Sequence, residues 1–134
     1  MTVKRRPLRV LVCGDRAWND PETIRKRLVL LPAGTLIIHG DQGQVKRRRD
    51  GSTYWIGADT QADHVAKALG LKTDPHPADW NKYGLAAGPR RNREMLDLKP
   101  DLVIAFHRKI EYSKGTKDTV EEAKKRGIKV EVII

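Results

Sequence analysis

The sequence predicts an α/β fold, a Rossmann-like three-layer α/β/α domain with a mainly parallel five-stranded sheet. Short runs rich in Val, Ile and Leu alternate along the chain with segments of helical spacing, which is the pattern of strands joined by crossover helices. The inner runs are almost continuously apolar, as expected for strands that helices cover on both faces. A length of 134 residues allows one such domain, spanning residues 1–134.

Each expected strand is a short apolar run, and the first two end at a glycine. The first run stops at Gly14 and the second at Gly40. The last run alternates apolar residues with Lys129 and Glu131, which is typical of a half-covered edge strand. The expected strands are residues 8–13, 35–39, about 71–76, 102–106 and 128–134.

Each expected helix begins or ends at residues typical of helix termini. Asp20 offers a capping side chain just before Pro21, which suits the first helical position. Gly88-Pro89 marks the first turn of another helix, and Gly70 and Gly127 fall where glycine commonly ends one. The expected helices are residues 21–30, 58–69, 85–98 and 115–126.

The order of these elements predicts where a ligand binds. Right-handed crossovers place the first strand at the centre of the sheet, with the strand at 102–106 beside it. In open sheets of this kind the ligand crevice lies beyond the carboxyl ends of the strands, at the point where the strand order switches. We therefore expect residues 14–16 to lie close to residues 107–116.

Residues 42–56 interrupt the alternation and predict a basic insertion, either a long exposed loop or a small hairpin. Four consecutive basic residues could bind nucleic acid through its phosphates. A solvated charged loop is the alternative that we favour, because no aromatic residue stands among the four. The four residues are Lys46, Arg47, Arg48 and Arg49.

Composition narrows the classes of protein and partner. The chain has 27 Lys and Arg against 17 Asp and Glu, a net charge of +10, which favours nucleic acid, nucleotide phosphates or another anionic partner. No apolar run approaches the ~18 residues that span a bilayer, and the first residues show no signal-peptide pattern, so we expect a cytoplasmic protein that does not enter membranes. Cys13 is the only cysteine, which excludes an internal disulfide and a zinc ribbon.

Small or anion-binding residues occur in four segments at strand ends or helix starts, namely residues 14–18, 57–59, 87–92 and 113–116. Helix N-termini offer free N–H groups and a positive dipole end, and glycine lets a phosphate approach the backbone. Each segment alone would be explained by ordinary capping, but together at one sheet edge they predict a phosphate-bearing ligand. The chain contains neither GxxxxGK[ST] nor GxGxxG, so we expect no P-loop hydrolysis of ATP and no ordinary dinucleotide site. The expected ligand-binding residues are Gly14, Asp15, Arg16, Trp18, Gly40, Gly57, Asp59, Gly88, Arg91, Asn92, Ser113, Gly115 and Thr116.

Other side chains near these segments have two interpretations each. Three histidines at expected strand ends, His39, His76 and His107, could hold a metal or act as a base, but ordinary packing is favoured. We therefore predict no metal site and no cofactor. Three aromatic residues could stack on a base, namely Trp18, Trp80 and Tyr83.

The joint pattern of these segments resembles a known family. The chain is similar to the YspA/cpYpsA-related branch of the SLOG superfamily in five places: Gly14-Asp15-Arg16-Ala17-Trp18, His39-Gly40, Gly57-Ala58-Asp59, the run from Pro77 through Met95, and Ser113-Lys114-Gly115-Thr116. That superfamily groups the Smf/DprA-like DNA-binding proteins with the Lonely Guy (LOG) phosphoribohydrolases. The resemblance covers nearly the whole chain except residues 46–54 and implies a Rossmann-like domain for nucleotides or nucleotide-derived ligands.

The resemblance also bears on catalysis. Thr119 stands where LOG enzymes carry a glutamate in their PGGxGTxxE motif, and Arg91-Asn92 matches their Arg-Lys pair only in the arginine. Without that carboxylate the obvious acid/base group is missing. The chain could therefore be a sensor, a sequestering protein or a weak nucleotide-processing hydrolase, and no catalytic residue is assigned.

We expect Arg91 and Arg16 to bind phosphate and Asp59 or Asp15 to bind ribose. The alternative function is that of a DNA-binding accessory protein of the Smf/DprA kind, suggested by the charge and the basic insertion. A homodimer is expected from the resemblance, with Met95 and Leu96 as a candidate apolar strip at its interface.

Overall fold

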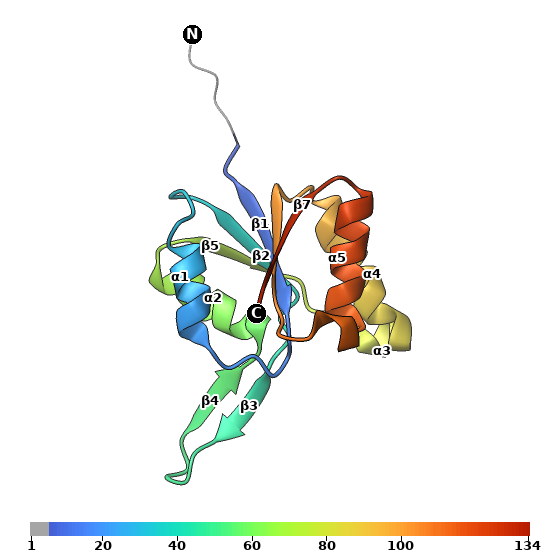
Figure 1. Ribbon diagram of the computed structural model, residues 1–134. Coiled ribbons are helices and arrows are strands. Elements are labelled where there is room, and N and C mark those ends of the chain that lie inside the picture. Colours follow the sequence, from blue (N-terminus) through green and yellow to red (C-terminus); the bar gives the residue numbers. More distant parts are fainter. Residues whose placement is uncertain (1–5) are drawn as a thin grey trace.

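A parallel five-stranded sheet forms the centre of the computed structural model, which describes residues 6–134 (Figure 1). The strand order is β5-β2-β1-β6-β7, and every neighbouring pair is parallel. The predicted α/β class is therefore confirmed, as is the central position of the first strand beside the strand at 102–106. The strands are β1 (Arg9–Gly14), β2 (Leu36–His39), β5 (Lys72–Pro75), β6 (Leu102–Phe106) and β7 (Lys129–Ile133).

Helices cover both faces of this sheet, two on each side (Figure 1). Helices α1 (Pro21–Leu28) and α2 (Ala58–Ala68) pack on one face, and α4 (Ala87–Asp97) and α5 (Gly115–Lys125) on the other. The Asp20 side chain accepts a hydrogen bond from the Thr23 N–H at 3.1 Å, so it caps α1 as predicted. Three short helical segments complete the fold: α3 (Trp80–Tyr83), η1 (Gly84–Ala86) and η2 (Ile110–Tyr112).

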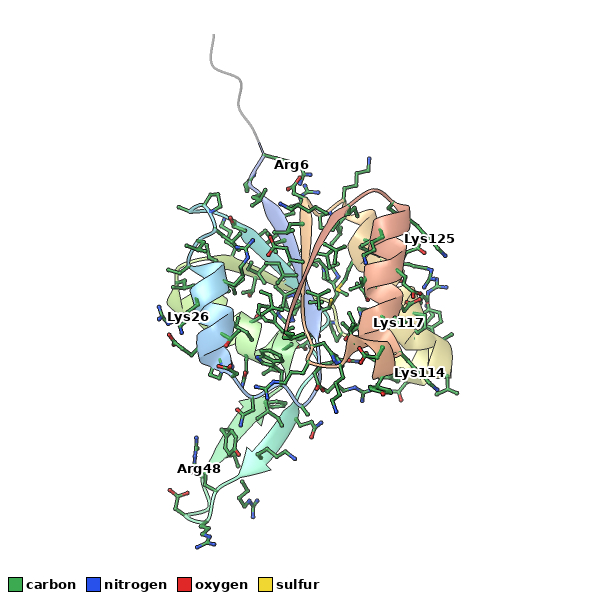
Figure 2. The ribbon with its side chains drawn as sticks, in the orientation of Figure 1. Arg6, Lys26, Arg48, Lys114, Lys117 and Lys125 are labelled. Carbon is green, nitrogen blue, oxygen red and sulfur yellow. The ribbon has the colours of Figure 1, made fainter. Side chains whose placement is uncertain are left out.

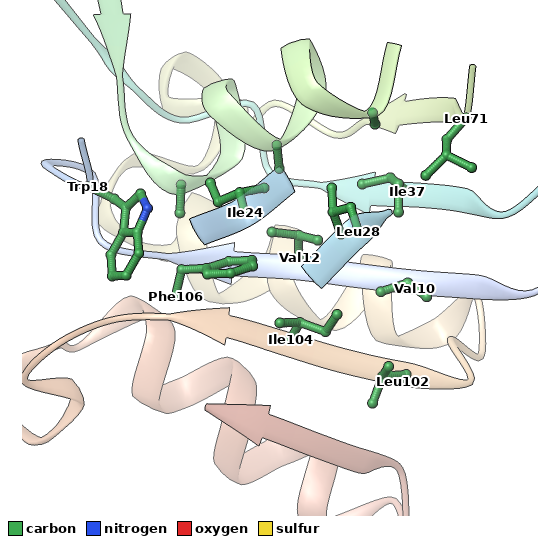
Figure 3. Close-up of a cluster of buried hydrophobic side chains, with 13 residues drawn as sticks. Val10, Val12, Trp18, Ile24, Leu28, Ile37, Leu71, Leu102, Ile104 and Phe106 are labelled. Atoms are coloured by element: carbon green, nitrogen blue, oxygen red, sulfur yellow. The ribbon is translucent and has the colours of Figure 1, made fainter. Parts of the chain in front are cut away.

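Two apolar cores lie on opposite faces of the sheet. The first is between the sheet and helices α1 and α2, where the rings of Trp18 and Phe106 meet at 5.6 Å between centroids (Figure 3). The second joins the sheet to α4 and α5, and it contains Met95 and Leu96, which are 2% and 1% exposed. The expectation that these two residues form a dimer interface is wrong, since the protein's own core covers them.

The basic insertion forms a hairpin outside the main sheet. Strands β3 (Gln44–Arg47) and β4 (Thr53–Ile56) pair antiparallel with each other and with no strand of the five-stranded sheet. The hairpin projects away from the body of the domain (Figure 1). Of the two structures considered for residues 42–56, the hairpin is the one that forms. Within residues 6–134, no helix has the length and apolar character required to cross a membrane.

Candidate functional site

A cavity of about 740 Å³ opens at the carboxyl edge of the central strands. Residues at the ends of β1 and β6 and just after β2 form its floor, and the starts of α4 and α5 form one side. Asp59, near the start of α2, reaches the cavity from the other face of the sheet. The topology thus brings together the three helix starts that the sequence pattern predicts.

Most of the expected ligand-binding residues line this cavity. The sequence pattern placed them far apart along the chain, and the parallel sheet gathers them at one edge. The predicted residues in its lining are Gly14, Asp15, Arg16, Gly40, Asp59, Gly88, Arg91, Asn92, Ser113, Gly115 and Thr116.

Two expected ligand-binding residues, Trp18 and Gly57, serve the fold instead. Trp18 is 4% exposed, packs on Phe106 and donates its indole N–H to the Asp20 carbonyl at 3.0 Å, so its ring is not available to a base. Gly57 adopts φ +117° at the junction of β4 and α2, and a Cβ there would lie 2.8 Å from Gly43 Cα. Its lack of a side chain permits close packing of the chain and does not make room for a ligand.

Arg91 is the buried cation of the cavity. Arg91 is only 6% exposed. Its Nη1 donates hydrogen bonds to the carbonyl oxygens of Gly40 and His76 at 2.5 and 3.1 Å. Nε donates to the Asn92 side chain at 3.0 Å. These bonds fix the plane of the guanidinium, and within residues 6–134 they leave Nη2 without a partner. Because Arg91 lines the cavity, Nη2 remains able to donate to a ligand there.

Two glycines allow the backbone to come close enough to build this floor. A Cβ on Gly40 would lie 2.5 Å from Nη1 of Arg91, so the guanidinium fills the space of the missing side chain. A Cβ on Gly14 would lie 2.7 Å from the Cβ of Ala58, which brings the end of β1 against the start of α2. Sequence reasoning interpreted Gly40 as a point of ligand approach, and its larger role is to seat Arg91.

Asp59 is a buried carboxyl group next to Arg91. Burial raises its pKa to about 6, although charge attraction from His39 and Arg91 and a backbone hydrogen bond from Gln42 oppose the shift. That bond joins the Gln42 N–H to Oδ2 at 3.2 Å. Burial also lowers the pKa of the Arg91 guanidinium, against the attraction of Asp59. The two groups therefore form a partly compensated pair inside the cavity.

The start of α5 supplies the opposite wall. The Thr116 N–H donates to Ser113 Oγ at 3.1 Å, which turns the chain into the helix. Lys114 also lines the cavity and is exposed. Asn92 links α4 to this wall, because its side-chain amide lies 3.5 Å from the Gly115 carbonyl.

Asp118, rather than a residue at position 119, brings a carboxylate to this wall. Thr119 is 2% exposed and donates its hydroxyl to the Gly115 carbonyl at 3.2 Å, so its side chain is used within α5. Asp118 lines the cavity and lies 3.4 Å from both the Asn92 amide and Nη1 of Arg93. Glu122 pairs with Arg93 of α4 and with Arg126 just after α5, and it is not part of the lining.

The three histidines differ in their positions. His39 is fully buried, its Nε2 lies 2.9 Å from Asp63 Oδ1, and its Nδ1 accepts from the Asp41 N–H, so it is a packed structural residue as favoured. His76 Nε2 lies 2.9 Å from Asp74 Oδ2, but the geometry does not make a hydrogen bond. Only His107 lines the cavity. No cluster of three or more potential metal ligands occurs within residues 6–134.

Exposed apolar side chains surround the mouth of the cavity. Trp80 is 47% exposed and lies over Gly88, whose Cβ position is 3.2 Å from the ring. Tyr112 and Leu85 line the cavity too and are 80% and 95% exposed. Of the aromatic residues proposed for stacking, Trp80 is therefore correctly placed, whereas the Tyr83 ring is covered by the guanidinium of Arg90 at 4.2 Å.

Several lining residues were not among those expected. Tyr112 and Gln42 lie in segments without periodicity, so no sequence pattern marks them. Lys114 lies within the predicted segment Ser113–Thr116, and its positive charge is the feature of the sequence that indicates an anion-binding role. Cys13 also lines the cavity, but burial raises the pKa of its thiol, so it remains a neutral, unreactive group.

The chemistry of the lining suits a ligand with both anionic and hydroxyl groups. Arg16, Arg91 and Lys114 provide positive charge, while Asp15, Asp59 and Asp118 can accept hydrogen bonds from hydroxyls. Trp80 and Tyr112 add flat apolar surfaces at the mouth.

Comparison with known proteins finds a similar chain of nearly equal length. The Gene 61 protein of Mycobacterium phage D29 is 34% identical over an alignment of 131 residues, which covers 91% of this chain and 93% of the relative. No protein-family model matches the chain, and no solved structure matches it significantly.

Proposed function

This chain belongs to the family of the Gene 61 protein of Mycobacterium phage D29, a name that states no activity, and from the cavity itself we propose that it binds a nucleotide or nucleotide-derived phosphate ligand. The observation that carries the proposal is the buried guanidinium of Arg91 at the floor of a cavity onto which three helices open.

The phosphate is proposed to bind between Arg91 and the start of α5. A buried arginine is costly unless its charge meets a negative group, and the hydrogen bonds that the Arg91 guanidinium makes within residues 6–134 all go to neutral oxygens. The backbone around Gly115 and the side chains of Lys114 and Arg16 supply further donors for an anion. This arrangement favours a phosphate over a neutral ligand.

The nucleoside part is proposed to extend from this anion site toward the mouth. Asp15 and Asp59 can accept hydrogen bonds from ribose hydroxyls, and the exposed Trp80 ring offers a stacking surface for a base. A volume of about 740 Å³ lies within the range of ~300–1,000 Å³ that small-molecule sites occupy. The cavity is thus large enough for a nucleotide.

Binding or sensing fits this site better than hydrolysis. The side chain of Thr119 is hydrogen-bonded within its own helix and offers no proton-transferring group to the cavity. Asp118 is the carboxylate of α5 in the lining, and it is already near Arg93 and Asn92. We therefore propose a sensor or sequestering protein, with at most slow hydrolysis.

A native mass spectrum of the freshly purified protein tests the proposal while the ligand is still unidentified. We expect an added mass that matches a nucleotide and that dissociates on denaturation. A thermal-shift panel of mononucleotides, ADP-ribose and cyclic dinucleotides then identifies the class, because a ligand that binds only the folded state raises the melting temperature. The absence of both an added mass and any stabilisation at millimolar ligand would refute nucleotide binding.

A further inference from the structure

We propose that the β3–β4 hairpin is a binding arm for single-stranded nucleic acid, separate from the cavity and independent of the function proposed for it. The hairpin carries four consecutive basic side chains, residues 46–49, and all of them are exposed. It projects from the body of the domain, with Arg48 at the end far from the sheet (Figures 1 and 2). A strand of nucleic acid could therefore reach these side chains without contacting the rest of the protein.

The positive charge of the hairpin is not neutralised by the protein. None of the four basic side chains forms an ion pair with an acidic side chain within residues 6–134, whereas Arg6, Arg27 and Arg126 on the body do. Asp50, the acidic residue of the turn, uses its carboxylate to accept hydrogen bonds from the N–H and hydroxyl of Ser52 at 2.8 and 2.6 Å. The turn is thus ordered by its own acid, and the arginines remain available for phosphates.

One face of the hairpin joins this charge to an exposed apolar surface. Val45 is paired with Trp55 across the two strands, and these side chains are 51% and 48% exposed. Arg47 lies on the same face, because residues two apart on a strand point to the same side. A tryptophan beside unpaired arginines is the combination with which proteins bind single strands, through base stacking and phosphate contacts.

The opposite face holds the arm in shape. The guanidinium of Arg48 lies 4.4 Å from the centre of the Tyr54 ring, and Ile56 is buried at the base of the hairpin. The Arg48 N–H also donates to the Ser52 carbonyl at 2.8 Å, closing the turn. Tyr54 is therefore engaged within the protein, which leaves Trp55 as the stacking residue.

Duplex DNA and a protein partner are the competing occupants. A two-stranded ribbon can enter the major groove of a duplex, and an exposed Trp-Val pair could bind another protein. An accessible Trp55 favours single strands, because the bases of a duplex are stacked on one another and their faces are not available to a side chain.

Fluorescence anisotropy with a labelled oligo-dT, its RNA counterpart and a duplex of the same length tests the proposal. We expect single strands to bind more tightly than the duplex. For single strands, the slope of log K against log salt concentration should be near −3 if all four basic side chains contact phosphates, since each contact contributes about −0.7. The Arg47→Gln/Arg49→Gln variant should reduce the magnitude of this slope by about 1.4. The matched control is Lys124→Gln/Lys125→Gln at the far end of α5, which makes the same change of charge on exposed side chains away from the hairpin (Figure 2).

The aromatic contact is tested separately. Trp55→Ala should weaken single-strand binding about fivefold or more, the lower end of what one stacked base contributes. Leu30→Ala removes an exposed apolar side chain outside both the hairpin and the cavity lining and should leave single-strand binding unchanged. Thermal melting checks that both variants are folded. The proposal is overturned if oligonucleotides fail to bind at low salt, if the duplex binds as well and Trp55→Ala has no effect, or if the control substitutions weaken binding as much as those in the hairpin.

Discussion

The guanidinium of Arg91 stands where a side chain on Gly40 would lie. Nη1 of Arg91 is 2.5 Å from the Gly40 carbonyl oxygen and equally close to the Cβ position of that glycine. A residue just after β2 and a residue in α4 are thereby locked together at the cavity floor. The position of the buried cation depends on the absence of a side chain at residue 40.

Gly40→Ala should therefore weaken ligand binding by displacing Arg91. The added methyl would require the guanidinium to move, and its two carbonyl contacts would be lost or lengthened. We expect the affinity for whichever nucleotide raises the melting temperature in the thermal-shift panel to fall about tenfold or more, as for the loss of a charge-assisted hydrogen bond. Calorimetric titration measures this effect.

Gly115→Ala controls for the conformational cost of replacing a glycine in thermal melting alone, because the backbone around Gly115 is itself part of the proposed anion site. A Cβ at Gly115 meets no atom within 4 Å, and this residue begins α5. The melting temperature of this variant should match or exceed that of the wild type, since alanine suits a helix better than glycine. Wild-type affinity in Gly40→Ala would show that the contact between the two residues does not position Arg91.

The buried carboxyl of Asp59 should make stability depend on pH between about 4 and 6. Its pKa is raised from 3.8 to about 6 in the folded protein, so the folded state binds more protons than the unfolded state in this interval. The contribution of Asp59 is full below the unfolded pKa and is lost as pH rises through 6. Asp59→Asn, which keeps an oxygen for the Gln42 N–H, should remove this loss and gain up to about 3 kcal/mol over the wild type at neutral pH.

Urea unfolding of both proteins across this pH range is the appropriate measurement. The Asp63 carboxyl provides an internal reference, because its pKa is shifted in the opposite direction and its contribution to stability therefore depends on pH in the opposite sense. Burial tends to raise its pKa, but hydrogen bonds from Lys67, His39 and Thr73 outweigh burial and lower it to about 2, so its contribution disappears only as pH falls toward 2. Parallel stability curves for wild type and Asp59→Asn between pH 4 and 7 would contradict the raised pKa.

Hydrolysis of nucleoside monophosphates should be slow or absent. Thr119 presents no carboxylate, and Asp118 is the group of α5 nearest to performing that role. Chromatography of AMP after incubation with the protein should show no release of adenine above the uncatalysed background. Ready release that disappears in Asp118→Asn but persists in Glu122→Gln would instead make the protein a hydrolase with a relocated carboxylate.

The homodimer predicted from the sequence needs a surface other than Met95 and Leu96. Leu85 is 95% exposed beside the cavity mouth, together with Tyr112 at 80%, and a second copy could cover both. We expect light scattering to give twice the 15.2 kDa of one chain, and Leu85→Asp to give the mass of one chain. A wild-type mass of 15.2 kDa, unchanged by ligand, would reject the dimer.

Local sequence patterns predict the strands and helices well because each of these elements depends mainly on residues within its own segment. Apolar runs mark the strands, Asp20-Pro21 marks the start of α1, and the parallel sheet then gathers the strand ends at one edge. What the patterns did not predict are contacts between distant segments. Trp18 resembles a ligand contact in sequence, but the turn after β1 returns it to the core on Phe106, 88 positions later.

The roles of glycines were also hidden from the sequence. Gly40 and Gly57 look like points where a ligand approaches the backbone, yet their neighbours are Arg91 and Gly43. Such neighbours are set by tertiary packing and leave no periodic signal. The hairpin shows the same limit, because Tyr54 and Trp55 follow the basic run in sequence and come to lie beside it only when β3 and β4 pair.

The central claim is that Arg91 binds the phosphate of a nucleotide in the cavity, and calorimetric titration of a nucleotide against its nucleoside tests it most directly. AMP with adenosine and GMP with guanosine serve as probes, in wild type, Arg91→Gln and the control Arg90→Gln, whose side chain is exposed. We predict that AMP or GMP binds the wild type and Arg90→Gln more tightly than the corresponding nucleoside does. In Arg91→Gln, nucleotide binding should weaken by about 1.5–3 kcal/mol while nucleoside binding changes little. Equal binding of nucleotide and nucleoside, or a phosphate preference that survives in a folded Arg91→Gln protein, would contradict the account.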